Sequence, residues 1–289
     1  MAIDFFELNG ANHVRQSFDS PTVYLDHWAM RLFSDDQQLQ DRFVGTLMAA
    51  GGTLLLSNLS FSEFAKATDP RHCTAAEAFL ERLLPNIYLT DFALDKVLER
   101  EQREPDNQRR FWPPSDLPSL KFLVERSGLI VPRLTMQGYV ALAHEGRDRV
   151  SASVATMAES VAQGLVEARG DLSYVSRAKT TPPSDKRPRT LLILGELMRG
   201  FNLDPNARFE GNDVIDLLHA AMPLNCCDFV LLDGAWSERV QKMKRRVAKN
   251  AMRMPMANVY SQRANGVEHF LADLEAFDKP VNAVNAAVP

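Results

Sequence analysis

The chain has 289 residues, of which 45% are hydrophobic and 24% are charged, a composition ordinary for a globular protein with a sizeable core. Its net charge of −4 excludes an overall basic coat for nucleic acid, although it is compatible with a local basic patch. Three cysteines exclude a disulfide framework, and the absence of a leader pattern or a long apolar run predicts a cytoplasmic protein without a membrane partner.

Strand and helix patterns alternate through residues 1–104. The run 22–25 is β-branched, aromatic and apolar and stops at Asp26, which predicts a strand with an acid at its carboxyl end. The other patterns of this part predict helices over 35–50, from 60, over 75–84 and over 92–103, and strands over 53–57 and 86–90. This order indicates a parallel sheet with right-handed crossovers.

The pattern changes after residue 104. Four prolines predict a loop over 104–119, and the chain then reads as helices, including a long amphipathic segment over 152–168. Residues 179–189 are polar and rich in proline and lysine, which predicts an exposed, mobile loop. We therefore interpret 105–190 as a helical insertion into a smaller α/β core.

The core resumes over 191–278 and is followed by a flexible tail over 279–289. An apolar run, 229–232, stops at Asp233 and predicts an interior strand. The remaining patterns predict helices over 191–201, from 213, over 237–250 and over 266–277, a turn at Pro223 and Asn225, and a last strand over 256–260. The fold class is then α/β, with an open parallel sheet, helices on both faces and a large helical insertion.

Five acids stand at element boundaries that can converge. Asp26 and Asp233 end two apolar strands, and Glu63 lies in the first turn of the helix after the second strand. Asp216 begins another helix, with Asp213 one turn earlier on the same face. The carboxyl ends of parallel strands and the starts of the following helices share one edge of a sheet, where ligands bind. We expect these acids to lie together there.

Crowded carboxylates repel one another, and a hard divalent cation relieves the repulsion. Mg²⁺ prefers oxygen ligands and is usually held by a few carboxylates plus substrate phosphate, so the acids predict a metal site for phosphodiester cleavage. The absence of a Cys/His cluster disfavours zinc. Each acid also has a structural interpretation, as a helix cap, a first-turn acid or half of the turn dipeptide Asp233-Gly234.

Four motifs together resemble the PIN domain, the nuclease fold of toxin–antitoxin ribonucleases: TVYLD, SFSEFAK, DLLHAA and FVLLDGAW. The resemblance covers roughly residues 20–100 and 190–275 and leaves the insertion unaccounted for. It implies a Mg²⁺- or Mn²⁺-dependent nuclease, most often acting on RNA, with Asp26, Glu63, Asp216 and Asp233 as metal-binding acids. The chain is longer than those ribonucleases. It also has His27 and Trp28 after the first acid, where the family commonly has small polar residues.

Several neighbours of the acids receive structural interpretations. His219 shares the helix face of Asp216, and we expect it to pack or hydrogen-bond near the acids rather than bind metal. Two tryptophans follow the strand-end acids, Trp28 and Trp236, and we expect them to cover the edge of the hydrophobic core. Asp228 lies at the opposite end of its strand from Asp233 and is excluded from the site.

The densest basic run follows Asp233 and is predicted to bind substrate phosphates; its residues are Lys242, Lys244, Arg245, Arg246 and Lys249. Lys186, Arg187 and Arg189 of the predicted loop are candidates for the same role. The common alternative is a solvated helix face.

Two other functions stay open at this point. One is a non-catalytic protein-interaction module on the same fold, and the other is a different Mg²⁺-dependent phosphoester hydrolase. Homo-oligomerisation or a regulatory protein partner is compatible with each of them.

Overall fold

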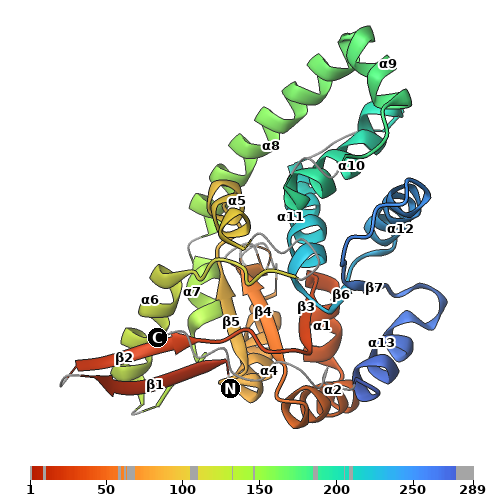
Figure 1. The fold of residues 1–289 in the computed structure, drawn as a ribbon. Helices are drawn as coiled ribbons and strands as arrows, with labels where there is room; N and C mark the ends of the chain where they lie inside the picture. The colour runs from red at the N-terminus through yellow and green to blue at the C-terminus, as the bar shows by residue number, and fades with distance from the viewer. Residues whose placement is uncertain are drawn as a thin grey trace.

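A five-stranded parallel sheet forms the centre of the computed structural model (Figure 1). The structure describes residues 2–8, 11–57, 60, 61, 63, 69–104, 110–131, 133–145, 147–184, 188–204, 206, 207 and 211–277. The strands are β3 (Thr22–Leu25), β4 (Thr53–Ser57), β5 (Ile87–Thr90), β6 (Phe229–Leu231) and β7 (Asn258–Tyr260). Their order is β5-β4-β3-β6-β7, and every neighbouring pair is parallel. The predicted α/β class with an open parallel sheet is confirmed.

The order of the strands reverses between β3 and β6. Chain order runs outward from β3 through β4 to β5, whereas β6 and β7 lie on the other side of β3. Leu25 pairs with Leu231 in register, so the carboxyl ends of β3 and β6 are level. Such a switch point is where open α/β sheets bind ligands.

Helices cover both faces of the sheet because the strands are apolar on both sides. Val23 and Leu25 belong to one buried cluster, and Tyr24 belongs to the other. The first face carries α1 (His27–Asp35), α2 (Gln37–Ala49), α4 (Pro70–Leu83), α6 (Leu117–Ile130), α7 (Tyr139–Glu145) and α13 (Gly266–Glu275), which follows η1 (Arg263–Asn265). The second face carries α5 (Leu94–Arg103), α10 (Arg189–Leu203), α11 (Gly211–Cys226) and α12 (Gly234–Lys249).

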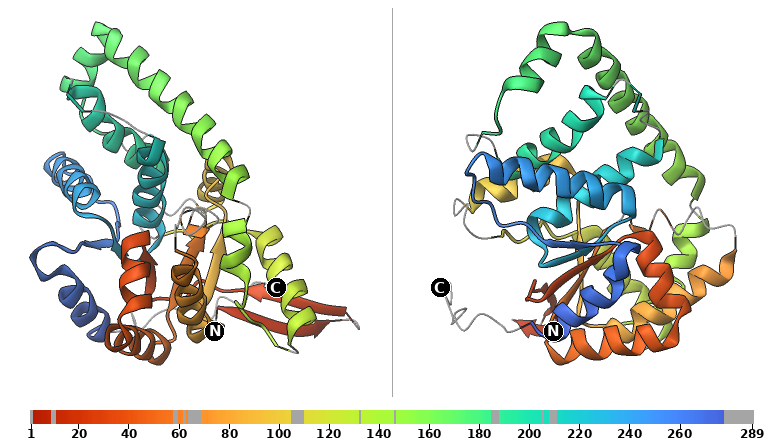
Figure 2. Two further views of the ribbon diagram at one scale, coloured as in Figure 1. Left: turned by 180° about the vertical axis from the view of Figure 1, so that it is seen from behind. Right: turned by 90° about the vertical axis from the view of Figure 1, so that its right-hand side faces the viewer.

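Two further helices, α8 (Arg147–Gly170) and α9 (Leu172–Thr180), extend away from the sheet, and we call them the helical arm (Figure 2). Helix α9 folds back along α10. The Arg199 side chain donates to the Ala178 carbonyl at 2.7 Å, and Asn202 donates to the Tyr174 hydroxyl at 2.9 Å. The arm lies within the predicted insertion, whereas α6 and α7 of the same range pack against the first face.

An antiparallel hairpin of β1 (Ile3–Leu8) and β2 (Ala11–Gln16) was not predicted. It projects from the β5 edge of the sheet (Figure 1). The Gln16 side chain bonds both the N–H and the carbonyl of Leu89, and the N–H of Ile3 donates to the Pro85 carbonyl. The hairpin therefore depends on contacts with residues about 70 or more positions away along the chain.

Some local predictions were wrong. Residues 27–35 form α1, which was not predicted, and α4 begins at Pro70 rather than at 75. The predicted helix over 35–50 is α2, and Asp36 caps it by accepting from the N–H groups of Gln38 and Leu39. Pro223 lies inside α11 rather than in a turn.

The prediction of a mobile loop over 179–189 was wrong at both ends of the range. Residues 179 and 180 are the last two residues of α9, and Arg189 is the first residue of α10 and is buried. Residues 185–187, and with them Lys186 and Arg187, lie outside the described residues, as does the tail over 279–289. Among the helices that the structure describes, none is both long and apolar enough to cross a membrane.

Candidate metal centre

The two strand-end acids meet at the switch point. Asp26 directly follows β3, and its N–H donates to the carbonyl of Leu231 in β6 at 3.0 Å. Asp233 follows β6, and its N–H donates to Oδ2 of Asp26 at 3.2 Å. Because β3 and β6 are parallel neighbours in register, their carboxyl ends place both residues at one point of the sheet edge.

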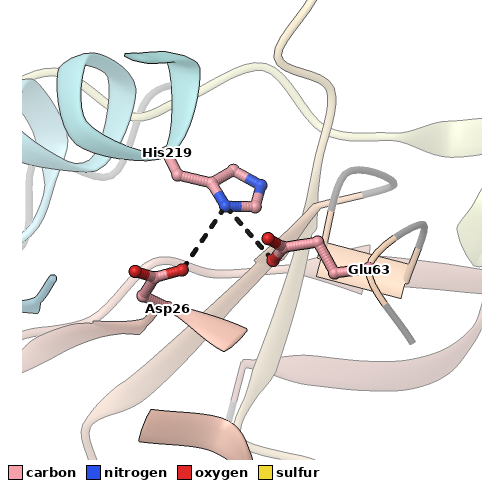
Figure 3. Close-up of side chains that lie close together, drawn as sticks. All are labelled: Asp26, Glu63 and His219. Atoms are coloured by element: carbon pink, nitrogen blue, oxygen red, sulfur yellow. Dashed lines mark ion pairs between the residues drawn. The ribbon is translucent and has the colours of Figure 1, made fainter. Parts of the chain in front are cut away.

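Asp26, Glu63 and His219 form a compact group (Figure 3). Each offers one ligand atom, and these atoms all lie within 4.8 Å of one another. Nδ1 of His219 lies 3.3 Å from Oε2 of Glu63 and 3.8 Å from Oδ1 of Asp26. Two carboxylates and an imidazole at this spacing are donors that can surround one divalent cation.

His219 is almost wholly buried, with 1% of its surface exposed. Its Nδ1 faces the two carboxylates, and its Nε2 has no hydrogen-bond partner among the described residues. Burial lowers the pKa of His219, but the negative charges of Glu63, Asp26 and Asp216 outweigh this effect and raise it above its ordinary value. The site therefore attracts positive charge, whether a proton on the ring or a metal ion among the carboxylates.

Asp216 lies beside the compact group. Burial, followed by the charges of Asp26 and Asp233, raises its pKa to about 7 against the opposing effect of His219. The indole N–H of Trp236 donates to Oδ2 of Asp216 at 3.2 Å and fixes the orientation of the carboxylate. Asp216 was predicted at the start of a helix, but α11 begins at Gly211 and Asp216 lies in its second turn. It nevertheless shares the electrostatic environment of the strand-end acids.

The compact group does not include Asp213, Asp216 or Asp233. Asp233 caps α12, with Oδ1 accepting from the N–H groups of Ala235 at 2.6 Å and Trp236 at 3.0 Å. Asp213 is half-buried in the first turn of α11, one turn before Asp216. Its predicted role as a metal ligand remains a prediction.

Sequence reasoning gave His219 a supporting role and did not consider Tyr24. The Tyr24 ring lies edge-on to His219, with centroids 5.6 Å apart. Burial, together with the charges of Asp26 and Glu63, raises the pKa of its hydroxyl well above the ordinary value. The signal available for His219 was its spacing of three residues from Asp216 on one helix face. Tyr24 gave no signal, because it reads as an ordinary core residue of β3.

Asp228 lies outside this group. Its carboxylate accepts from the N–H and the hydroxyl of Thr22 at 2.8 and 2.9 Å and pairs with Arg110. Thr22 begins β3, so Asp228 fixes the amino ends of the two strands, opposite to the acids.

The predicted phosphate-binding residues of α12 divide into two sets. Lys244 donates to the Ala257 carbonyl, and burial lowers its pKa to about 8. Arg246 pairs with Glu196 at 2.8 Å and also donates to the carbonyl of Thr181. Lys244 and Arg246 therefore bond α12 to neighbouring segments of the fold. The other three are exposed: Lys242, Arg245 and Lys249.

Comparisons of the chain with protein-family models, with curated proteins and with solved structures found no match.

Proposed function

We propose that the protein is a metal-dependent nuclease that hydrolyses phosphodiester bonds, with RNA preferred to DNA as substrate. The observation that carries the proposal is the compact group of Asp26, Glu63 and His219 at the switch point, with Asp216 and Asp233 beside it. These residues come from distant parts of the chain, and the group is buried where like charges are costly. The preference for RNA comes from the resemblance to PIN domains alone.

The donors fit Mg²⁺ or Mn²⁺. Asp26 and Glu63 supply the carboxylate oxygens that both ions prefer, and the imidazole of His219 adds one nitrogen donor. Nε2 of His219 is buried without a hydrogen-bond partner among the described residues, and it is the kind of buried polar atom that a bound group would satisfy. A bound ion would supply Lewis-acid stabilisation of the charge that develops on the phosphate.

The chain itself would position the reactants. Asp26 and Glu63 would hold the ion, and His219 would complete their coordination or fix their orientation. Asp216, held by Trp236, would take the proton of the attacking water. Asp233 lies across from Asp26 and would add negative charge that favours cation binding.

The experiment combines Mn²⁺ calorimetry with cleavage of a labelled single-stranded RNA. The variants Asp26→Asn and Asp233→Asn remove charge with little change of volume. We expect Asp26→Asn to lose the heat of Mn²⁺ binding, and both variants to lose at least about a hundredfold in cleavage rate. The control is Glu125→Gln, which alters an exposed acid of α6. Undiminished cleavage by both aspartate variants would show that the mechanism is wrong.

An interaction module is the second candidate, because the helical arm exposes apolar residues. Val166 and Leu172 are 71% and 81% exposed. An apolar pocket of about 610 Å³ lies where α8 meets α5, α10 and α11, with Phe92, Leu94 and Val161 among its lining residues. Absence of any heat with Mn²⁺ would favour this function over the nuclease.

A further inference from the structure

Arg239 of α12 is held by aromatic rings. Its guanidinium carbon lies 4.0 Å from the centroid of the Phe201 ring and 5.6 Å from that of Trp236. The two rings are themselves in contact, with centroids 5.8 Å apart, and both side chains are buried. A guanidinium over aromatic rings is attracted by their quadrupoles, and this attraction restricts its rotamers even without a ligand.

Two other arginines in or beside α12 are neutralised by acids. Arg246 pairs with Glu196, and Arg263, next to the start of α12, pairs with Glu238. Within the residues that the structure places, no carboxylate lies at ion-pair distance from Arg239, which is partly exposed. Its donors thus remain available to an anion from solution.

One indole ring connects this cation to the acids. Trp236 lies against the guanidinium of Arg239 and donates its N–H to Oδ2 of Asp216. A polyanionic strand approaching the carboxylates of the candidate metal centre is repelled wherever no cation compensates. The guanidinium of Arg239 lies over the same Trp236 ring that bonds Asp216, and it can provide that compensation next to the acids.

We propose that Arg239 binds a phosphate of the substrate strand next to the phosphate that is cleaved, through two parallel N–H donors. The proposal rests on the proposed nuclease function. Phe201 and Trp236 hold the planar guanidinium in place, so the arginine and the acids together set which phosphate lies at the metal centre. Arg239 is then a substrate-binding residue, and neither the acids nor the metal depends on it.

Binding is measured separately from cleavage, by fluorescence anisotropy of a short labelled oligouridylate in EDTA between about 50 and 200 mM KCl. We expect Arg239→Gln to weaken binding roughly tenfold and to lower the slope of log K against log salt by about 0.7, the value for one phosphate contact on a single strand. In Mn²⁺, the same variant should raise KM by a similar factor and leave kcat nearly unchanged.

The matched control is Arg253→Gln, which removes the same charge from an exposed position after α12. Arg239→Lys keeps the positive charge but lacks the two parallel N–H donors of the guanidinium. It should therefore keep the wild-type slope of log K against log salt and lose only part of the affinity. Thermal melting and Mn²⁺ calorimetry show whether each variant is folded with an intact metal centre.

The outcomes separate the two proposals. If the wild-type protein binds the oligonucleotide and Arg239→Gln binds it with wild-type slope and affinity, the role of Arg239 is overturned and the nuclease proposal stands. If binding depends on Arg239 but nothing is cleaved, the hydrolysis is overturned and the anion site stands. Failure of the wild-type protein to bind at any salt concentration overturns the Arg239 proposal.

Discussion

The proton on Asp216 links this residue to the stability of the metal-free protein. Its pKa rises from an ordinary 3.8 to about 7 in the folded state, so the folded protein retains a proton that the unfolded chain loses. This contribution to stability is complete below about pH 4 and is lost as the pH rises through 7. The maximum effect is about 4 kcal/mol, at about 1.4 kcal/mol per pH unit.

We therefore expect the free energy of unfolding of the wild-type protein, measured with urea in EDTA, to fall between about pH 4 and pH 7. In Asp216→Asn it should fall less over the same range, because the amide does not titrate. Groups common to both proteins cancel in the difference. Parallel stability profiles for the two proteins would contradict the raised pKa.

At the same scale, the sequence predicted the acids better than it predicted their partners. An acid that ends an apolar run is visible in the sequence, so Asp26 and Asp233 were recognised from the runs before them. The position of His219 between Asp26 and Glu63 depends on the angle at which α11 crosses the end of β3. No local pattern contains that angle.

At the scale of elements, one acid connects two distant helices. Glu101 of α5 is 6% exposed and accepts from the backbone N–H groups of Arg189 at 2.5 Å and Thr190 at 3.2 Å. These groups begin α10, whose N-cap is Pro188 and has no side-chain cap. Glu101 thus caps α10 from 88 residues away and also lies near the Arg189 guanidinium.

We predict that Glu101→Ala lowers the free energy of unfolding by roughly 3 kcal/mol, because it leaves the two buried N–H groups at the start of α10 without the carboxylate that accepts from them. Urea unfolding measures the change. The control is Glu99→Gln on the same helix, whose side chain is 63% exposed and should cost less than about 1 kcal/mol. Equal effects would show that Glu101 does not cap α10.

Elements with strong local signals were predicted well. The strands at 22–25 and 53–57 are confirmed at both ends, because buried parallel strands read as short apolar runs. The beginning of α10 at Arg189 was missed, since its cap comes from α5. The same reason applies to the hairpin of β1 and β2, which is held by β5. Contacts between distant segments decide these boundaries, and a sequence window does not contain them.

At the scale of the molecule, the candidate metal centre joins segments that are otherwise separate in the chain. Asp26 ends β3, Glu63 follows β4, and His219 belongs to α11, more than 150 residues later. An ion bound by all three would couple both halves of the core across the switch point. Such an ion binds the folded state and not the unfolded chain, and it stabilises the fold by mass action.

Mn²⁺ at a hundred times its dissociation constant should add about 2.7 kcal/mol to the free energy of unfolding and raise the melting temperature by roughly 5 °C. Differential scanning calorimetry with and without EDTA measures the shift. Asp26→Asn should melt at the same temperature in both conditions, whereas Glu125→Gln should show the wild-type shift. Repulsion among the ionised acids grows as Asp216 loses its proton, so Mn²⁺ should bind more tightly at pH 8 than at pH 6. At one fixed Mn²⁺ concentration, the shift should therefore be larger at pH 8. A shift that persists in Asp26→Asn would place the ion elsewhere on the molecule.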